Sequence, residues 1–116
     1  MSKKKIPSID LARAARKALL DKKGSDVEIL DMRGLSDVTD FYVIATGNNN
    51  PHLKALWSEC EDVLQANRSR AYRHAGKPES GWLVGDYWDV VVHIFSEEAR
   101  RNYALEILWR DATRVD

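Results

Sequence analysis

Residues 41–46 (FYVIAT) form a short apolar run between a turn-rich segment and the glycine and asparagines of residues 47–50. A run of this length without polar alternation indicates a strand that is buried on both faces. Such a strand requires covering layers on both sides, which helices supply in a mixed sheet. The chain has 116 residues, enough for one core of this kind and too few for two. We therefore expect a single α/β domain over residues 1–116, in which residues 1–7 form a flexible tail.

Three segments have the pattern of helices packed on that sheet. The first follows Ser8 as the candidate cap and ends at residues 22–24, where two lysines precede a glycine that is free to adopt a positive φ. Its expected apolar stripe consists of Ile9, Ala12, Ala15, Leu19 and Leu20. The second starts at Asn50 as the cap with Pro51 in the first helical position. It is expected to bury Leu53, Leu56, Trp57, Cys60, Val63 and Leu64. The third opens at Ser96, and its apolar positions are Tyr103, Leu105, Ile107, Leu108 and Trp109.

Further strands are expected around the apolar run. Residues 27–32 form the first of them, and residues 82–84 and 90–95 form a pair joined by a turn at residues 86–89. A short strand is also expected around residues 71–73. The predicted fold is therefore α/β (α+β), a mixed central β-sheet flanked by helices.

Charge and cysteine content exclude several classes of protein. The 18 basic and 18 acidic residues cancel, so no overall field attracts the chain to nucleic acid or to an anionic membrane. Cys60 is the single cysteine, which excludes a disulfide framework and a thiolate zinc site and suits a reducing cytoplasm. No apolar stretch approaches the roughly 18 residues that span a bilayer. We expect a cytoplasmic protein with no cofactor, no metal, no membrane contact and no direct sequence-specific nucleic-acid binding.

The best enzyme candidate is Thr46-Gly47 ahead of a helix, combined with carboxylates on later strands. A glycine turn at a helix N-terminus can hold phosphate, and paired carboxylates can hold magnesium, as in nucleotidyltransferases. The chain has no G-x-G-x-x-G and no G-K-[ST] motif. Asp86 and Asp89 are three residues apart across a turn, and Asp37 and Asp40 have the same spacing, whereas a shared ion requires alternate strand positions. We interpret all four aspartates as loop-shaping residues.

The histidines and the basic cluster have simpler explanations than catalysis. His93 lies in an apolar strand without a nucleophile motif, so we interpret it as a hydrogen-bonded core or interface histidine rather than a base. Cys60 falls on the buried stripe of its helix and is interpreted as an apolar filler. The cluster Arg68, Arg70, Arg73 and His74 with Tyr72 could stack on single-stranded RNA or could guard an edge strand with charge.

Four tryptophans are more than one small core requires. Trp57 and Trp109 lie on helical stripes and are assigned to the core. Trp82 and Trp88 flank the turn at Asp86, and exposed aromatic residues beside charges are typical of protein–protein hot spots. The alternative is that Trp82 packs under a loop, and both interpretations stay open at this point.

Three long blocks of the sequence resemble the ribosomal silencing factor family, also called Iojap-like. The first is Asp31 with residues 34–47 (GLSDVTDFYVIATG). The second joins residues 79–84 (ESGWLV) to residues 86–95 (DYWDVVVHIF), and the third is residues 100–109 (RRNYALEILW). The blocks follow in order, and the resemblance extends over roughly residues 9–112.

The resemblance implies a fold related to nucleotidyltransferases without the catalytic carboxylates, and hence no enzyme activity. It implies binding to the large ribosomal subunit through large-subunit ribosomal protein fourteen, which blocks joining of the small subunit and represses translation under nutrient limitation. It also implies a homodimer. The alternatives are a nucleotidyltransferase-like enzyme and a ribosome-assembly factor, the role of organellar relatives.

We expect partner contacts on or beside one surface that joins an aromatic anchor to carboxylates. Its predicted residues are Trp82, Leu83, Asp86, Tyr87, Asp89 and His93. The chain departs from the family pattern at Trp88, a position that is often glycine, which suggests an unusual turn geometry or an added contact aromatic. It also departs at residues 48–52 (NNNPH), which stand where the family more usually has a residue with a small hydroxyl side chain as the helix cap.

Overall fold

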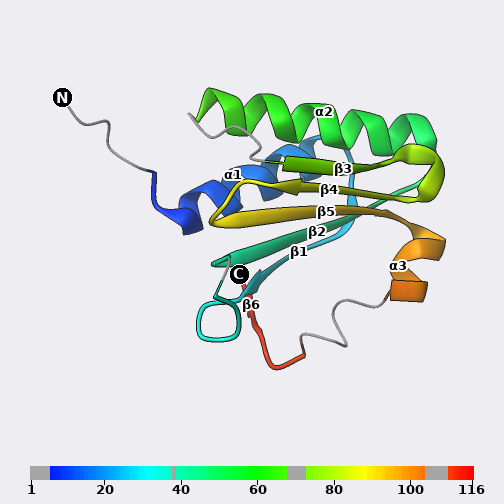
Figure 1. Cartoon of the computed structure of the whole chain (residues 1–116). Coiled ribbons are helices and arrows are strands. Elements are labelled where there is room, and N and C mark those ends of the chain that lie inside the picture. Colours follow the sequence, from blue (N-terminus) through cyan, green and yellow to red (C-terminus); the bar gives the residue numbers. More distant parts are fainter. Residues whose placement is uncertain (1–5, 38, 68–72, 104–109) are drawn as a thin grey trace.

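A computed structural model describes residues 6–37, 39–67, 73–103 and 110–116. Its described helices are α1 (Ser8–Asp21), α2 (Asn50–Ala66) and α3 (Glu97–Tyr103), with a short 3₁₀ turn, η1 (Pro78–Ser80). Its described strands are β1 (Ser25–Asp31), β2 (Phe41–Gly47), β3 (Arg73–Lys77), β4 (Trp82–Asp86), β5 (Val90–Ser96) and β6 (Thr113–Val115). These strands form one sheet in the order β3-β4-β5-β2-β1-β6 (Figure 1).

The apolar run 41–46 lies in the middle of the sheet, as predicted. It forms β2, which pairs antiparallel with β1 and parallel with β5. The parallel register runs from Phe41 opposite Val90 to Gly47 opposite Ser96. All residues of β2 are buried except Tyr42, which is half-buried. The predicted hairpin is also confirmed, because β4 and β5 pair antiparallel around the turn after Asp86. The mixed sheet is therefore the fold that the sequence predicts.

Helices α1 and α2 pack side by side on one face of the sheet (Figure 1). Between them and the sheet lies the larger core, whose buried members include Ala12, Ala15, Leu19, Val43, Leu53, Leu56, Cys60, Leu64, Val92 and Ile94. On the opposite face, α3 packs against β5 and β2 over a smaller cluster. That cluster consists of Leu30, Met32, Ile44, Phe95 and Ala99. The second face is thus covered less completely by the described helices than the first.

The helix ends differ from the predictions in three details. Ser8 is not the cap of α1: Pro7 occupies that position, and the Ser8 hydroxyl donates to Asp40 Oδ2 at 2.8 Å. The positive φ after α1 belongs to Lys23 (64°) rather than to Gly24. Gly24 instead allows close packing, since a Cβ there would lie 3.0 Å from the Leu19 carbonyl oxygen. Helix α2 starts one residue early, because Asn49 is the cap and its side chain accepts from the His52 backbone N–H at 2.8 Å.

Other differences concern the exposure of helix side chains and the bounds of the strands. Leu20, predicted on the buried stripe of α1, is 53% exposed, and Trp57 and Val63 are only half-buried. The predicted strand at residues 71–73 starts at Arg73 as β3, and residues 71 and 72 lie outside the described residues. Strand β6, which pairs antiparallel with β1, was not predicted. Ser96 does cap α3, since its hydroxyl accepts from the Ala99 N–H at 3.1 Å, but the predicted apolar positions 105–109 lie outside the described residues.

Candidate partner-binding face

Side chains of β4 alternate between the two faces of the sheet, as strand geometry requires. Leu83 and Gly85 point toward α2 and are buried, whereas Trp82, Val84 and Asp86 are half-buried on the opposite face. We call the face with Trp82 the open face. It is the face on which α3 packs, since Trp82 contacts the smaller core cluster.

Four aromatic rings from three neighbouring strands gather on the open face. Trp82 of β4 lies beside Phe95 of β5, with ring centroids 5.2 Å apart, because the two residues are direct cross-strand partners. His93 of β5 meets Tyr42 of β2 edge-on at 4.8 Å and lies parallel to the Phe95 ring at 6.0 Å. We call Tyr42, Trp82, His93 and Phe95 the aromatic cluster.

A hydrogen bond orients Trp82 in this cluster. The indole Nε1–H donates to His93 Nδ1 at 3.1 Å. The imidazole is 7% exposed, and its burial lowers the pKa of His93 to about 4. The ring is therefore neutral at physiological pH, and because Nδ1 accepts a hydrogen bond, the proton is on Nε2. Nε2 has no hydrogen-bond partner among the described residues. The structure agrees with our interpretation of His93 as a buried, hydrogen-bonded histidine.

An apolar groove lies beside Trp82. It has a volume of about 330 Å³ and is lined by Ala75 and Gly76 of β3, Ser80 of η1, and Trp82 and Val84 of β4. Gly76 has a φ of 94°, and a Cβ there would collide with the backbone oxygen of Trp82. The groove and the half-buried indole together offer an apolar side chain a place to dock.

The turn after β4 carries the two aspartates of the predicted surface. Asp86 Oδ1 accepts from the Trp88 backbone N–H at 2.9 Å, and its Oδ2 lies 3.8 Å from Arg73 Nη2. The Asp89 backbone carbonyl accepts from the N–H groups of Asp40 at 2.9 Å and Phe41 at 3.1 Å. Burial raises the pKa of Tyr42, and the charge of Asp86 adds to this effect. Asp86 thus shapes the turn through its side chain, as predicted, whereas the contacts of Asp89 are made by its backbone carbonyl, and both residues are half-buried at one end of β4.

Two of the predicted contact residues lie on the other side of the sheet. Leu83 and Tyr87 are buried in the larger core beneath α2. Gly85 between them admits the Trp57 ring, because a Cβ there would come within 2.8 Å of it. Burial raises the pKa of Tyr87, and its hydroxyl has no hydrogen-bond partner among the described residues. The structure therefore brings Trp82, Asp86 and His93 together on the open face and leaves Leu83 and Tyr87 behind it.

Trp88 is a residue that the predicted surface omits. Its φ is 71°, which is unusual for a bulky residue, and its side chain is 59% exposed. The turn thus has the unusual geometry that the departure from the family pattern suggests. The sequence points to Trp88 both through that departure and through its place beside the aspartates of the turn.

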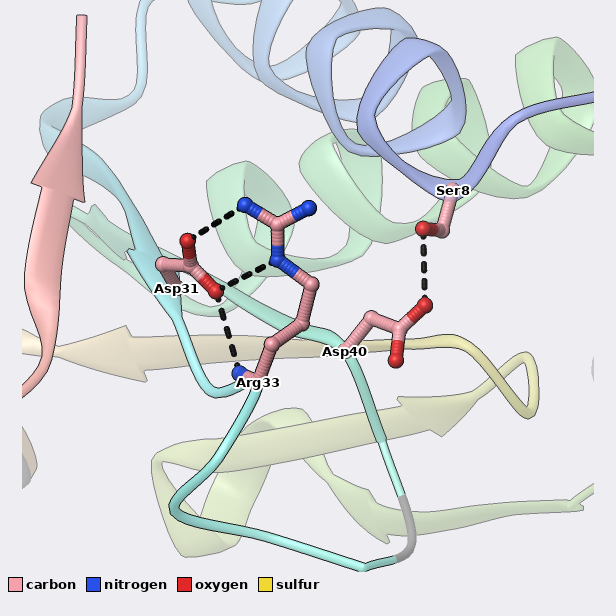
Figure 2. Close-up of polar contacts among 4 residues, drawn as sticks. All are labelled: Ser8, Asp31, Arg33 and Asp40. Atoms are coloured by element: carbon pink, nitrogen blue, oxygen red, sulfur yellow. Dashed lines mark hydrogen bonds and ion pairs between the residues drawn. The ribbon is translucent and has the colours of Figure 1, made fainter.

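Polar contacts at the start of β2 are structural (Figure 2). The Arg33 guanidinium bonds both carboxylate oxygens of Asp31, at 2.9 and 2.7 Å, and lowers the pKa of that carboxyl. The Asp40 carboxylate accepts from Ser8 and so ties the loop to the start of α1 (Figure 2). These contacts give the carboxylates of Asp31 and Asp40 partners from the chain itself.

A pocket lies at the carboxyl end of β5 beside the first residue of α2, next to the glycine turn that was considered as a phosphate site. It has a volume of about 400 Å³, and its polar lining includes Asn50, Ser96, Asn102, Glu79 and Glu98. The described lining residues include two glutamates and no cation, so the pocket suits phosphate poorly.

Within the described ranges, no group of three His, Cys, Asp or Glu side chains could hold a metal ion. Cys60 is buried, and burial raises the pKa of its thiol to about 12, as expected of an apolar filler. No described helix is long and apolar enough to cross a membrane.

Comparison with known proteins decides the family. Residues 5–116 match the family described as ribosomal silencing factor during starvation. The chain belongs to the ribosomal silencing factor family. This confirms the resemblance of the three sequence blocks, and the family is regulatory rather than enzymatic.

Relatives and solved structures agree with this assignment. The chain is 36% identical to ribosomal silencing factor RsfS of Bacillus subtilis, with 91% of this chain and 90% of that protein covered. It is 32% identical to the chloroplastic protein Iojap of Zea mays, of which it covers 47%. A crystal structure of a Chromobacterium violaceum protein superposes with a TM-score of 0.86 at 30% identity, covering 90% of this chain and 87% of that chain. A crystal structure of a Bacillus halodurans protein superposes with a TM-score of 0.81 at 34% identity, covering 93% of this chain and 98% of that chain.

Proposed function

We propose that the chain binds the large ribosomal subunit in the cytoplasm through large-subunit ribosomal protein fourteen. Binding there blocks joining of the small subunit and represses translation under nutrient limitation. Membership of the ribosomal silencing factor family supports this role. The single structural observation that supports the site is the Trp82 indole, held by its hydrogen bond to His93 beside an apolar groove.

The open face supplies both parts of a protein-binding surface. Half-buried Trp82 gives an aromatic anchor whose orientation is already set, so little side-chain entropy is lost on docking. Asp86 and Asp89 at the end of β4 give negative charge, and ribosomal proteins are generally basic. On this proposal the aromatic cluster provides affinity, and the carboxylates steer the encounter.

Truncation of the anchor tests the site. Trp82→Ala should weaken binding to purified large subunits by at least about 2 kcal/mol in sucrose-gradient cosedimentation. Trp82→Phe keeps a six-membered aromatic ring but loses the pyrrole part of the indole with its N–H, so it should weaken binding less than Trp82→Ala does. Ser58→Ala, an exposed change on α2, is the control and should bind as the wild type does.

Thermal melts of the same variants separate binding from folding. A strong drop in the melting temperature of Trp82→Ala, together with normal binding by its folded fraction, would mean that Trp82 is a core residue and that the site is wrongly assigned. Failure of the wild type to cosediment with large subunits would reject the proposed function itself.

We also infer that the chain forms a homodimer and no direct nucleic-acid complex. Family membership supports the first inference, and the zero net charge supports the second. Light scattering should give twice the 13.2 kDa mass of one chain. A mass of one chain at micromolar concentration would reject the dimer.

A further inference from the structure

Glu28 is a charged residue in the middle of β1, on the open face of the sheet. It alternates with Leu30, which belongs to the smaller core cluster on that face. Its side chain is 24% exposed, so the carboxylate is partly shielded from water. A shielded carboxylate raises the free energy of the folded state unless cations or other donors face it. The partners of Glu28 therefore show what this residue does.

Two arginines from two different elements bind the two oxygens of this carboxylate. Arg100 of α3 donates from Nη2 to Glu28 Oε2 at 3.2 Å, and Nε of Arg114 in β6 lies 3.1 Å from Oε1. Arg100 also donates to Thr46 Oγ1 of β2 at 2.9 Å. The Arg100 side chain is 10% exposed, whereas that of Arg114 is 64% exposed. The contact with α3 is thus the stronger of the two, because water screens an exposed ion pair.

Strand β6 is short and lies at the edge of the sheet, beside β1. It pairs with β1 over residues 113–115, and Arg16 of α1 donates to the Val115 carbonyl at 3.1 Å. The pairing covers the apolar end of β1, which would otherwise be an edge open to other chains. A strand of three residues forms few backbone hydrogen bonds, so side-chain contacts such as the ion pair with Glu28 matter for its position.

Helix α3 covers the smaller core cluster. Ala99 of α3 is buried in that cluster together with Phe95, and Ala112, just before β6, packs against the same cluster. The Phe95 ring in turn lies 5.2 Å from that of Trp82. The two segments that Glu28 binds therefore cover apolar side chains that adjoin the aromatic cluster of the open face.

We propose that Glu28 is a shared latch. It holds α3 over the smaller core cluster and β6 along the edge of β1, so that loss of this one carboxylate loosens both elements. The latch is a conformational device that goes beyond the proposed function and does not depend on it. Its opening exposes the smaller core cluster and the edge of β1.

Glu28→Gln tests the latch, because the amide keeps the size of the side chain and removes its charge. Hydrogen exchange should become at least about five-fold faster for the amides of α3, which lose a charged contact to a mostly buried arginine. It should become about two- to five-fold faster for the amides of β6, whose ion pair is more exposed. Glu79→Gln changes an exposed carboxylate on η1 and is the matched control, which should leave both elements unchanged.

Variants of the two arginines separate the contacts of the latch. Arg114→Gln should speed exchange in β6 and spare α3, and Arg100→Gln should speed exchange in α3 and spare β6. The double variant should loosen both elements as Glu28→Gln does, and it replaces Glu28→Gln if that variant does not fold. Faster exchange in only one element, or in neither, when the carboxylate or both arginines are replaced would overturn the inference. Failure of the wild type to bind large subunits, in contrast, would reject only the proposed function.

Discussion

Burial of the His93 side chain couples the stability of the protein to pH. In the unfolded chain a histidine takes up its proton near pH 6.5, whereas the folded chain protonates His93 only near pH 4. The unfolded state therefore binds more protons between these values, and acid favours unfolding. We expect the free energy of unfolding to fall by up to about 3 kcal/mol as the pH drops from 6.5 to 4. Urea titrations at half-unit pH intervals measure this loss.

Two variants identify the group responsible. His93→Phe has no proton to bind and should flatten the pH dependence between 6.5 and 4. Leu20→Ser, an exposed change on α1 that removes no titratable group, should keep the wild-type slope. The Asp31 carboxyl, whose pKa Arg33 lowers, loses its contribution to stability mainly as the pH falls below the ordinary aspartate pKa of about 3.9, so it contributes little over most of this window. An unchanged slope in His93→Phe would contradict the assignment.

The predicted contact residues were expected on or beside one surface, and the structure divides them between the two faces of the sheet. Trp82, Asp86 and His93 share the open face, whereas Leu83 and Tyr87 face α2. The alternation of β4 could not be assigned in advance, because both of its faces carry apolar residues and both are at least partly covered. His93 Nε2, which has no hydrogen-bond partner within the described ranges, also has no sequence signature, since its state depends on which nitrogen Trp82 contacts across the hairpin.

Helix α3 is held on the open face by an ion pair and a hydrogen bond from one arginine. Arg100 bonds Thr46 Oγ1 of β2 at 2.9 Å and Glu28 of β1 at 3.2 Å, and its side chain is 10% exposed. Replacing it with glutamine should lower the free energy of unfolding by about 1–3 kcal/mol, because buried polar partners lose their charged donor. Urea denaturation measures the loss, and hydrogen exchange should show faster opening of α3.

The neighbouring residue provides the comparison. Arg101 lies on the same helix and is exposed, so Arg101→Gln should change stability by less than about 0.5 kcal/mol. Equal losses in the two variants would mean that the charge of α3, rather than the contacts of Arg100, determines the effect.

Helices and strands could be predicted where neighbouring residues determine them. The prediction failed where residues distant in the sequence determine the structure. The periodicity of α2 and the apolar run of β2 identify those elements without further information. Ser8 has the composition of a helix cap, but it bonds a carboxylate 32 residues away. Strand β6 has three residues and an exposed pattern, so only its pairing with β1 defines it.

The protein carries no net charge, but the proposed partner-binding face has local negative charge. Asp86 and Asp89 lie in one turn at the end of β4, where they can attract a basic partner before contact. Asp86→Asn keeps an oxygen acceptor for the Trp88 N–H and removes the charge, and Asp89→Asn removes the second charge of the turn. The double variant should reduce the association rate with large subunits by about three-fold at low salt and leave the dissociation rate nearly unchanged.

Salt distinguishes steering from direct contact. The Debye length shortens from about 30 Å at 0.01 M to about 10 Å at 0.1 M salt, so the rate difference between the double variant and the wild type should shrink as salt rises. Asp62→Asn, an exposed carboxylate on α2 behind the sheet, controls for net charge and should bind at the wild-type rate. Stopped-flow experiments at several salt concentrations measure the association rates of the double variant, the control and the wild type. A salt-independent deficit carried by the dissociation rate would show that the two aspartates contact the partner directly and that steering by this turn is not their role.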